Sequence, residues 1–167
     1  CPEGFRPYAS LVATETKPLM PRESRPPLLF RLAKFMERHR IRGWYRLHQA
    51  IQRSTLLDRD VIYDLAPGIR IVVPMHLSYS YRFFDQYYLD HYEEDLIDRL
   101  AQKAGLLPEP VTLVDCGADI GIFTNKLVMR APSIRNVVAF EPNREIEIYL
   151  ARNLANHPFT TKAYTVA

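Results

Sequence analysis

A glycine-bearing loop between a short apolar strand and a helix constrains the fold of this chain more than any other segment. Residues 111–115 have the length and branched side chains of a buried strand, and residues 122–130 have helical spacing. The loop 116–121 joins them, and a second apolar strand follows at 136–141. Strand, helix and strand in this order predict a parallel βαβ unit with a right-handed crossover.

The same alternation continues to the end of the sequence. Residues 144–156 carry Ile146, Leu150 and Leu154 on one helical stripe, and residues 160–166 have the composition of a third strand. We therefore expect an α/β fold in which three parallel strands alternate with helices.

The sequence before this unit predicts a helical and β-hairpin extension. Residues 28–53 have helical spacing that a break near Gly43 would divide in two, and residues 60–75 read as strand, turn and strand. The aromatic stretch 79–92 is expected to pack in a core, with a ligand-facing wall as the alternative. Residues 92–104 are expected to form a helix. These patterns divide the chain into a disordered Pro-rich lead (1–27), the extension (28–107) and the α/β part (108–167).

Positive charge is concentrated in the segment 22–53. It holds nine Lys and Arg residues against two acids, so it carries +7 whereas the whole chain carries +3. We expect a solvated helix face, with the arginines in solvent and an apolar stripe packed against protein. That stripe comprises Leu32, Phe35, Met36, Trp44 and Leu47. Contact with a nucleic acid is not expected, because base-stacking aromatic residues are scarce in the segment; peripheral contact with a membrane stays open.

Cysteine and histidine positions do not indicate a metal site. Cys1 and Cys116 lack metal-type spacing and the five histidines are scattered, so we expect no metal. No apolar run approaches the roughly 20 residues of a membrane span, and we expect a cytoplasmic protein. The sequence begins with Cys1 rather than Met, and we expect a fragment of a longer protein whose oligomeric state the sequence does not predict.

The chemistry of the chain is expected at the carboxyl ends of the first two strands, where ligands of open α/β sheets bind. Gly117 allows a sharp turn and close approach of a ligand, and Gly121 allows the following helix to pack against its strand. Asp115 can order the loop or receive an ammonium group. Glu141, which ends the neighbouring strand, can accept hydrogen bonds from two ribose hydroxyls.

The residues that are missing narrow the choice of nucleotide. A dinucleotide-binding loop has a middle glycine where this chain has Asp119, whose charge would repel a pyrophosphate. The lysine of a phosphate-binding loop is also absent. A loop with carboxylates suits a cofactor that has no phosphate and ends in a cationic amino acid. We therefore expect S-adenosylmethionine as the cofactor.

At these residues the chain resembles the FkbM-type S-adenosylmethionine-dependent methyltransferases. Residues 114–124 are similar to the family's V-D-x-G-A-N-x-G-x-[FY]-[ST] loop, 138–142 to its V-x-A-F-E-P motif and 152–156 to its L-x-x-N-x-x-x-N helix. The similarity runs from about Tyr92 onward. Asp119 departs from the family's usual Asn, and its charge disfavours a direct hydrogen bond to the cofactor carboxylate.

The resemblance implies a fold and an activity. The fold is a Rossmann-like class I methyltransferase sheet, of which this chain holds the first three parallel strands. The activity is methyl transfer to a hydroxyl of a sugar, a glycan or a small metabolite. The cofactor-binding residues implied by position are Asp115, Cys116, Gly117, Ala118, Gly121, Glu141 and Pro142. Among these, Glu141 would hold the ribose.

No catalytic residue is assigned. In the family, later strands bring the adenine wall, the substrate pocket and any general base, so we expect this chain alone to be inactive. Two other functions stay open. One is an RNA- or protein-directed methyltransferase that uses the basic segment 22–53. The other is a non-enzymatic segment that binds a membrane or a partner protein, which would leave the motifs from Asp115 to Glu141 without a role.

Overall fold

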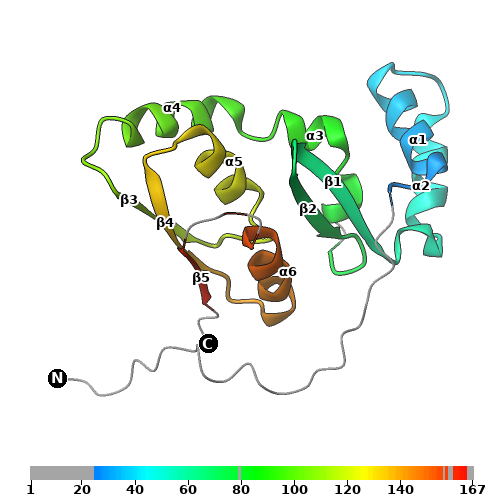
Figure 1. Cartoon of the computed structure of the whole chain (residues 1–167). Coiled ribbons are helices and arrows are strands. Elements are labelled where there is room, and N and C mark those ends of the chain that lie inside the picture. The colour runs from blue at the N-terminus through cyan, green and yellow to red at the C-terminus, as the bar shows by residue number, and fades with distance from the viewer. Residues whose placement is uncertain (1–24, 79, 156, 158–159, 165–167) are drawn as a thin grey trace.

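The computed structural model describes residues 25–78, 80–155, 157 and 160–164. The expected disordered lead, 1–27, lies outside the described residues apart from 25–27. The chain is a mixed α/β protein with a two-stranded antiparallel sheet and a three-stranded parallel sheet (Figure 1). Within the described part of the chain, no helix is both long enough and apolar enough to cross a membrane.

The N-terminal part confirms the predicted helix break and hairpin. The first helix ends at Arg38, Arg40 then has a φ of +52°, and Gly43, with a φ of +93°, directly precedes the second helix. Gly68, with a φ of +81°, lies in the turn of the hairpin, whose strands pair Val61 with Val73. The elements are α1 (Leu28–Arg38), α2 (Trp44–Gln52), η2 (Thr55–Leu57), β1 (Asp60–Ala66), β2 (Ile69–Pro74), η3 (Ser80–Phe83) and α3 (Gln86–Asp90).

The C-terminal part confirms the predicted alternation of parallel strands and helices. The strand order is β3-β4-β5, and both pairings are parallel. Asp115 is level with Ala139, and Phe140 is level with Tyr164, so the carboxyl ends of the strands meet at one edge. The elements are α4 (Glu94–Ala104), β3 (Val111–Cys116), α5 (Ile122–Arg130), β4 (Ile134–Phe140), α6 (Arg144–Leu154) and β5 (Thr160–Tyr164).

Helices α4, α5 and α6 share one hydrophobic cluster with the parallel sheet (Figure 1). Ile97 of α4, Leu127 of α5 and Leu150 of α6 meet Val137 of β4 in this cluster. Side chains on the other face of β3 are exposed, and Val114 retains 56% of its surface. The parallel sheet is therefore covered on one face within the described residues.

The N-terminal part packs against the loop and the helices that follow it, and both parts share buried polar contacts. Its cluster, which includes Phe30 and Tyr81, extends to Ile120 of the loop and Ile146 of α6. Asn153 of α6 is buried, accepts a hydrogen bond from the Val72 N–H at 2.8 Å and donates to the Ile120 carbonyl at 2.8 Å. This asparagine ties the hairpin to the loop, because each of its bonds satisfies a buried backbone group.

The face that α1 buries differs from the prediction. Phe30 and Ala33 are buried, whereas Leu32 and Phe35 of the predicted stripe are 45% and 52% exposed. The expectation that Leu32 and Phe35 pack against protein is wrong. Apolar residues occupy more than half of the circumference of this helix, so their spacing does not decide which side faces the core.

Candidate functional site

A cavity of about 450 Å³ lies beside the loop between β3 and α5. Three of the predicted cofactor-binding residues, Asp115, Gly117 and Ala118, line it. The other four are not among its lining residues: Cys116 and Pro142 are exposed, and Gly121 and Glu141 are buried beside it. The remaining lining residues are Ser80, Phe84, Tyr88, Tyr92, Glu93, Leu96, Asp119, Ile122 and Phe123.

Gly117 turns the loop at the mouth of this cavity. Its φ is +83°, and a Cβ atom built there would meet no atom within 4 Å. The N–H groups of Gly117 and Ala118 both donate to the Phe140 carbonyl, at 2.8 and 3.0 Å, which fastens the loop to the end of β4. Gly117 is therefore required for the backbone turn and leaves open space beside it.

Gly121 has the same left-handed backbone but a different environment. Its φ is +82°, and an added Cβ would lie 2.9 Å from Cδ1 of Leu150 and 3.4 Å from Nδ2 of Asn125. The expected role is to let the following helix pack against its strand, whereas the close approach that the structure shows is to Leu150 of α6. Gly121 therefore allows the loop to lie close to α6, and it is not among the residues that line the cavity.

Glu141 holds the loop and the start of α6 with its two carboxylate oxygens. Oε2 accepts the Asp119 N–H at 2.9 Å, and Oε1 accepts the Asn143 N–H at 2.9 Å. The side chain is buried, with 8% of the residue surface exposed. Each oxygen has a second acceptor direction, so the carboxylate can accept two further hydrogen bonds from a ligand.

Asp115 and Asp119 add negative charge to the cavity. The Asp115 carboxylate, at the end of β3, accepts a hydrogen bond from the Thr124 hydroxyl. Asp119, with a φ of +51°, turns its carboxylate to the hydroxyl of Tyr81, a residue that is buried. Partial burial raises the pKa of Asp119 and the nearby Glu141 adds to the rise, while the Tyr81 hydrogen bond opposes it. The lining residues include the three acids Glu93, Asp115 and Asp119 and neither lysine nor arginine.

The segment from η3 to α4 forms the opposite wall of the cavity, which the sequence reasoning assigned to core packing. Tyr81 and Phe84 are buried, but Tyr88 is 40% exposed and lines the cavity together with Tyr92. Burial raises the pKa of Tyr92 to about 12, and Glu93 contributes, so its hydroxyl stays protonated. The spacing of Tyr88 and Tyr92, four residues apart as on one face of a helix, is the sequence signal that could have indicated this wall.

A second cavity of about 640 Å³ adjoins the first. It shares Tyr88, Tyr92 and Glu93 with the first cavity and continues along Phe83 and Tyr87. Tyr88, Tyr92 and Glu93 therefore border two adjoining spaces, each large enough for a small organic molecule.

Comparison with known proteins gives one partial likeness. The chain is 39% identical over 67 residues to the AMB antimetabolite synthetase AmbE of Pseudomonas aeruginosa. The matched part is 40% of this chain and 3% of that protein, so the likeness covers less than half of the chain and a small part of the synthetase. No protein-family model matches the chain. The resemblance to FkbM-type methyltransferases therefore rests on the loop and strand-end motifs.

Proposed function

We propose that this chain supplies the S-adenosylmethionine site of a methyltransferase that acts on a hydroxyl of a sugar, a glycan or a small metabolite. The observation that carries the proposal is the acid-lined cavity beside Gly117, at the end of β3, with the buried Glu141 at the end of β4. This is the edge at which open α/β sheets bind nucleotides. A Rossmann-like class I methyltransferase sheet belongs to the same proposal, and the order β3-β4-β5 is compatible with it.

The chemistry of the cavity fits the two ends of this cofactor. Glu93, Asp115 and Asp119 suit the ammonium and sulfonium cations. The spare acceptor directions of Glu141 suit the two ribose hydroxyls. The Gly117 and Ala118 N–H groups are already bonded to Phe140, so the cofactor's carboxylate needs other donors. The hydroxyls of Ser80 and Tyr88, which line the cavity, are suited to that role.

The acceptor would lie in the adjoining cavity, against Tyr88 and Tyr92. S-adenosylmethionine supplies an activated methyl group, and transfer requires the acceptor oxygen to approach it in line. The shared tyrosine wall would hold the acceptor in that orientation and exclude water. The likeness to part of an antimetabolite synthetase favours a small metabolite as the acceptor. We assign no general base.

Cofactor titration of matched variants tests the proposal. Glu141→Gln replaces one acceptor oxygen by an amide group, and we expect it to weaken S-adenosylmethionine binding by about 1.5–3 kcal/mol, the range for hydrogen bonds to charged groups. Glu145→Gln is the control, because Glu145 is an exposed acid on α6, outside the cavity. Isothermal calorimetry on the protein measures both. Equal affinity of the Glu141→Gln variant and the wild type would show that Glu141 does not bind the cofactor.

A further inference from the structure

The outward side of α1 is apolar. Leu28, Leu32 and Phe35 lie at helical spacing on the side away from the buried Phe30 and Ala33. They are 78%, 45% and 52% exposed, and Leu29 beside them is 48% exposed. An amphipathic helix of a globular protein normally turns such a stripe inward. The stripe on α1 therefore faces water in the described structure.

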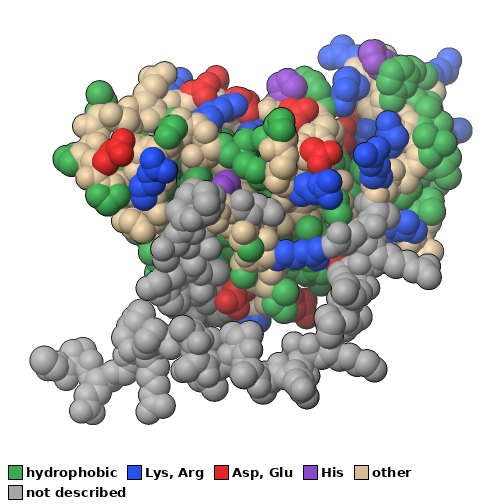
Figure 2. All heavy atoms as spheres, viewed as in Figure 1, with side chains coloured by type: hydrophobic (Ala, Val, Ile, Leu, Met, Phe, Trp, Pro, Cys, Tyr) green, Lys and Arg blue, Asp and Glu red, His purple; other side chains and the backbone are tan. Residues whose placement is uncertain are grey.

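The apolar surface continues past the end of α1. Ile41, in the connection, is 40% exposed, and Tyr45, in the first turn of α2, is 57% exposed. Figure 2 shows hydrophobic side chains gathered over the α1–α2 end of the molecule, with Lys and Arg side chains beside them. We call these six residues the α1–α2 patch: Leu28, Leu29, Leu32, Phe35, Ile41 and Tyr45.

Unpaired arginines surround the patch. Arg31, Arg40, Arg42 and Arg46 are exposed, and none of them forms an ion pair with another described residue. The next cations along α1 are paired, Lys34 with Glu37 and Arg38 with Asp85. The positive charge of this segment is therefore available to an external anion.

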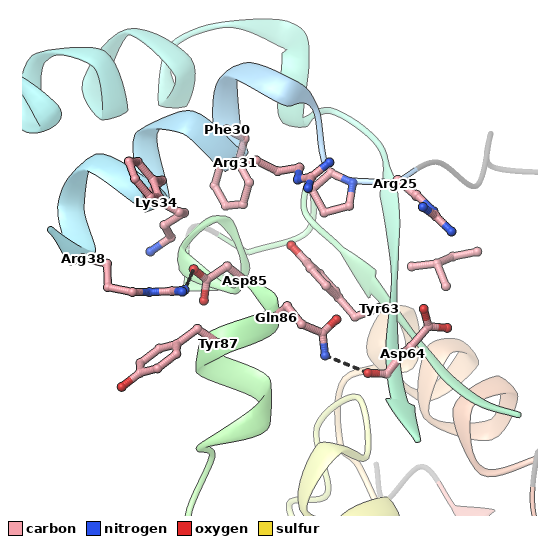
Figure 3. A pocket seen from close by; sticks show the side chains of 13 residues that line it. Arg25, Phe30, Arg31, Lys34, Arg38, Tyr63, Asp64, Asp85, Gln86 and Tyr87 are labelled. Carbon is pink, nitrogen blue, oxygen red and sulfur yellow. Dashed lines mark hydrogen bonds and ion pairs between the residues drawn. The ribbon is translucent and has the colours of Figure 1, made fainter. Parts of the chain in front are cut away.

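A cavity of about 360 Å³ opens next to α1. Arg25 and Arg31 line it, together with Lys34, Arg38 and the aromatic rings of Tyr63 and Tyr87. Figure 3 shows these cations around the cavity, with Arg38 directed to Asp85. Asp64 and Asp85 also line this cavity, but Arg25 and Arg31 form no ion pair with another described residue, so their guanidinium groups can receive a phosphate oxygen from outside the protein.

We infer that the α1–α2 patch docks on an anionic lipid surface. Leucine, isoleucine and aromatic side chains enter the boundary between headgroups and acyl chains, and the surrounding arginines meet lipid phosphates. The exposed arginines form no ion pair with another described residue and lie beside exposed leucine and aromatic side chains, the combination by which an amphipathic surface meets anionic headgroups. The pairing of exposed apolar and free cationic groups therefore matches a lipid surface. The inference is independent of the proposed cofactor site, because no residue of the patch lines the cavity beside Gly117.

Vesicle flotation of the protein tests the inference. Wild-type protein is mixed with vesicles of phosphatidylcholine alone or with about one third phosphatidylglycerol, at low and high salt. We expect flotation with the anionic vesicles at low salt and at least a tenfold smaller bound fraction with neutral vesicles or at high salt, because screening removes the electrostatic attraction.

Matched variants distinguish binding through the α1–α2 patch from non-specific adsorption to vesicles. Leu28→Ser/Leu32→Ser/Phe35→Ser should abolish flotation, and Arg40→Gln/Arg42→Gln/Arg46→Gln should reduce it about tenfold. Leu106→Ser/Leu107→Ser is the control, since these leucines are 85% and 55% exposed after α4 and should not matter. Circular dichroism verifies that each variant folds. Flotation that the patch variants retain, or patch-dependent dimerisation of a wild type that ignores vesicles, would overturn the inference. S-adenosylmethionine titration of the same variants reports separately on the cofactor site.

Discussion

Gly117 and Gly121 share a left-handed backbone, yet their surroundings give them separate tasks. A side chain at Gly117 would enter the open side of the loop, whereas one at Gly121 would collide with Leu150 of α6. The spacing of the two glycines predicts a ligand loop and a packing role for Gly121, but it does not predict that the packing partner is α6. The distinction arises from α6, which returns to the loop only in the folded protein.

Alanine at Gly117 should be marked by weaker cofactor binding, whereas alanine at Gly121 should be marked by the larger loss of stability. Gly117→Ala should lower the free energy of unfolding by about 1–2 kcal/mol, the cost of a left-handed non-glycine residue, and should weaken S-adenosylmethionine binding at least about tenfold. Gly121→Ala should lower the free energy of unfolding by about 1–3 kcal/mol more than Gly117→Ala does, because the added methyl overpacks the contact with Leu150. Chemical denaturation and calorimetric titration measure the two effects. The assignment fails if Gly117→Ala binds the cofactor like the wild type.

His48 makes the stability of the protein sensitive to mild acid. It is buried, and Gln52 Nε2, which can only donate, lies 3.1 Å from its Nε2. Burial lowers the pKa of His48 below its usual 6.5 and Lys34 lowers it further, although Glu37 opposes them. The unfolded chain therefore takes up the proton first, so this stability is present above pH 6.5 and is lost as the pH falls toward the folded-state pKa.

Substitution of His48 tests this linkage. The wild type should lose stability as the pH falls below about 6.5, the ordinary pKa of histidine, and the loss should be smaller in His48→Gln. Burial also lowers the pKa of His157, so part of the loss should persist in the variant. Urea denaturation at a series of pH values gives the slope for each protein. An unchanged slope in His48→Gln would exclude the imidazole as the proton acceptor.

At the scale of elements, Lys126 of α5 determines where α3 and α4 meet. Its side chain is buried, and Nζ donates to the carbonyls of Leu89 at 2.8 Å, Asp90 at 3.0 Å and Tyr92 at 3.3 Å. It also pairs with Glu94 in the first turn of α4. These bonds bring one ammonium group to three backbone carbonyls at and just after the end of α3. Tyr88 and Tyr92, which line the cavity, are positioned by this junction.

Lys126→Met should destabilise the junction of α3 and α4 that positions Tyr88 and Tyr92, without changing the loop between β3 and α5. Methionine keeps the apolar stem but removes the hydrogen bonds to the three carbonyls and the ion pair with Glu94, at a cost of about 1–3 kcal/mol. Lys103→Met, at an exposed position near the end of α4, should change stability by less than about 0.5 kcal/mol. Thermal unfolding compares the two variants. Equal stability of both would show that the Lys126 bonds do not hold the junction.

The predictions from sequence were most successful where local chemistry decides an element. The hairpin follows from apolar strands around Pro67-Gly68, and the start of α2 follows from Gly43, because both glycines take positive φ values. The buried side of α1 could not be predicted, since it depends on which residues of distant elements accept Phe30. The partners of Glu141 could not be predicted either, because the Asp119 N–H reaches it only after the two strands have paired.

At the scale of the whole molecule, the two sides of the parallel sheet have different environments. Three helices cover one face, and the other face exposes Val114. Strand β3 pairs with β4 on one edge and has no second strand partner among the described residues. An unpaired edge beside exposed apolar side chains is a template for pairing with another chain. The cofactor edge and the open face both belong to β3, so whatever covers this face also adjoins the proposed site.

We therefore predict that this 167-residue chain self-associates through β3. Sedimentation velocity at increasing protein concentration should show oligomers, because the free strand edge and the uncovered face are removed from water together. Val114→Lys should shift the distribution toward monomer, since a charged side chain on an edge strand opposes pairing. Ile148→Lys is the matched control, because Ile148 is 68% exposed on α6, away from the open face, and this variant should associate like the wild type. If the wild type stays monomeric at all concentrations, the open face of β3 is stable in water and the association argument is wrong.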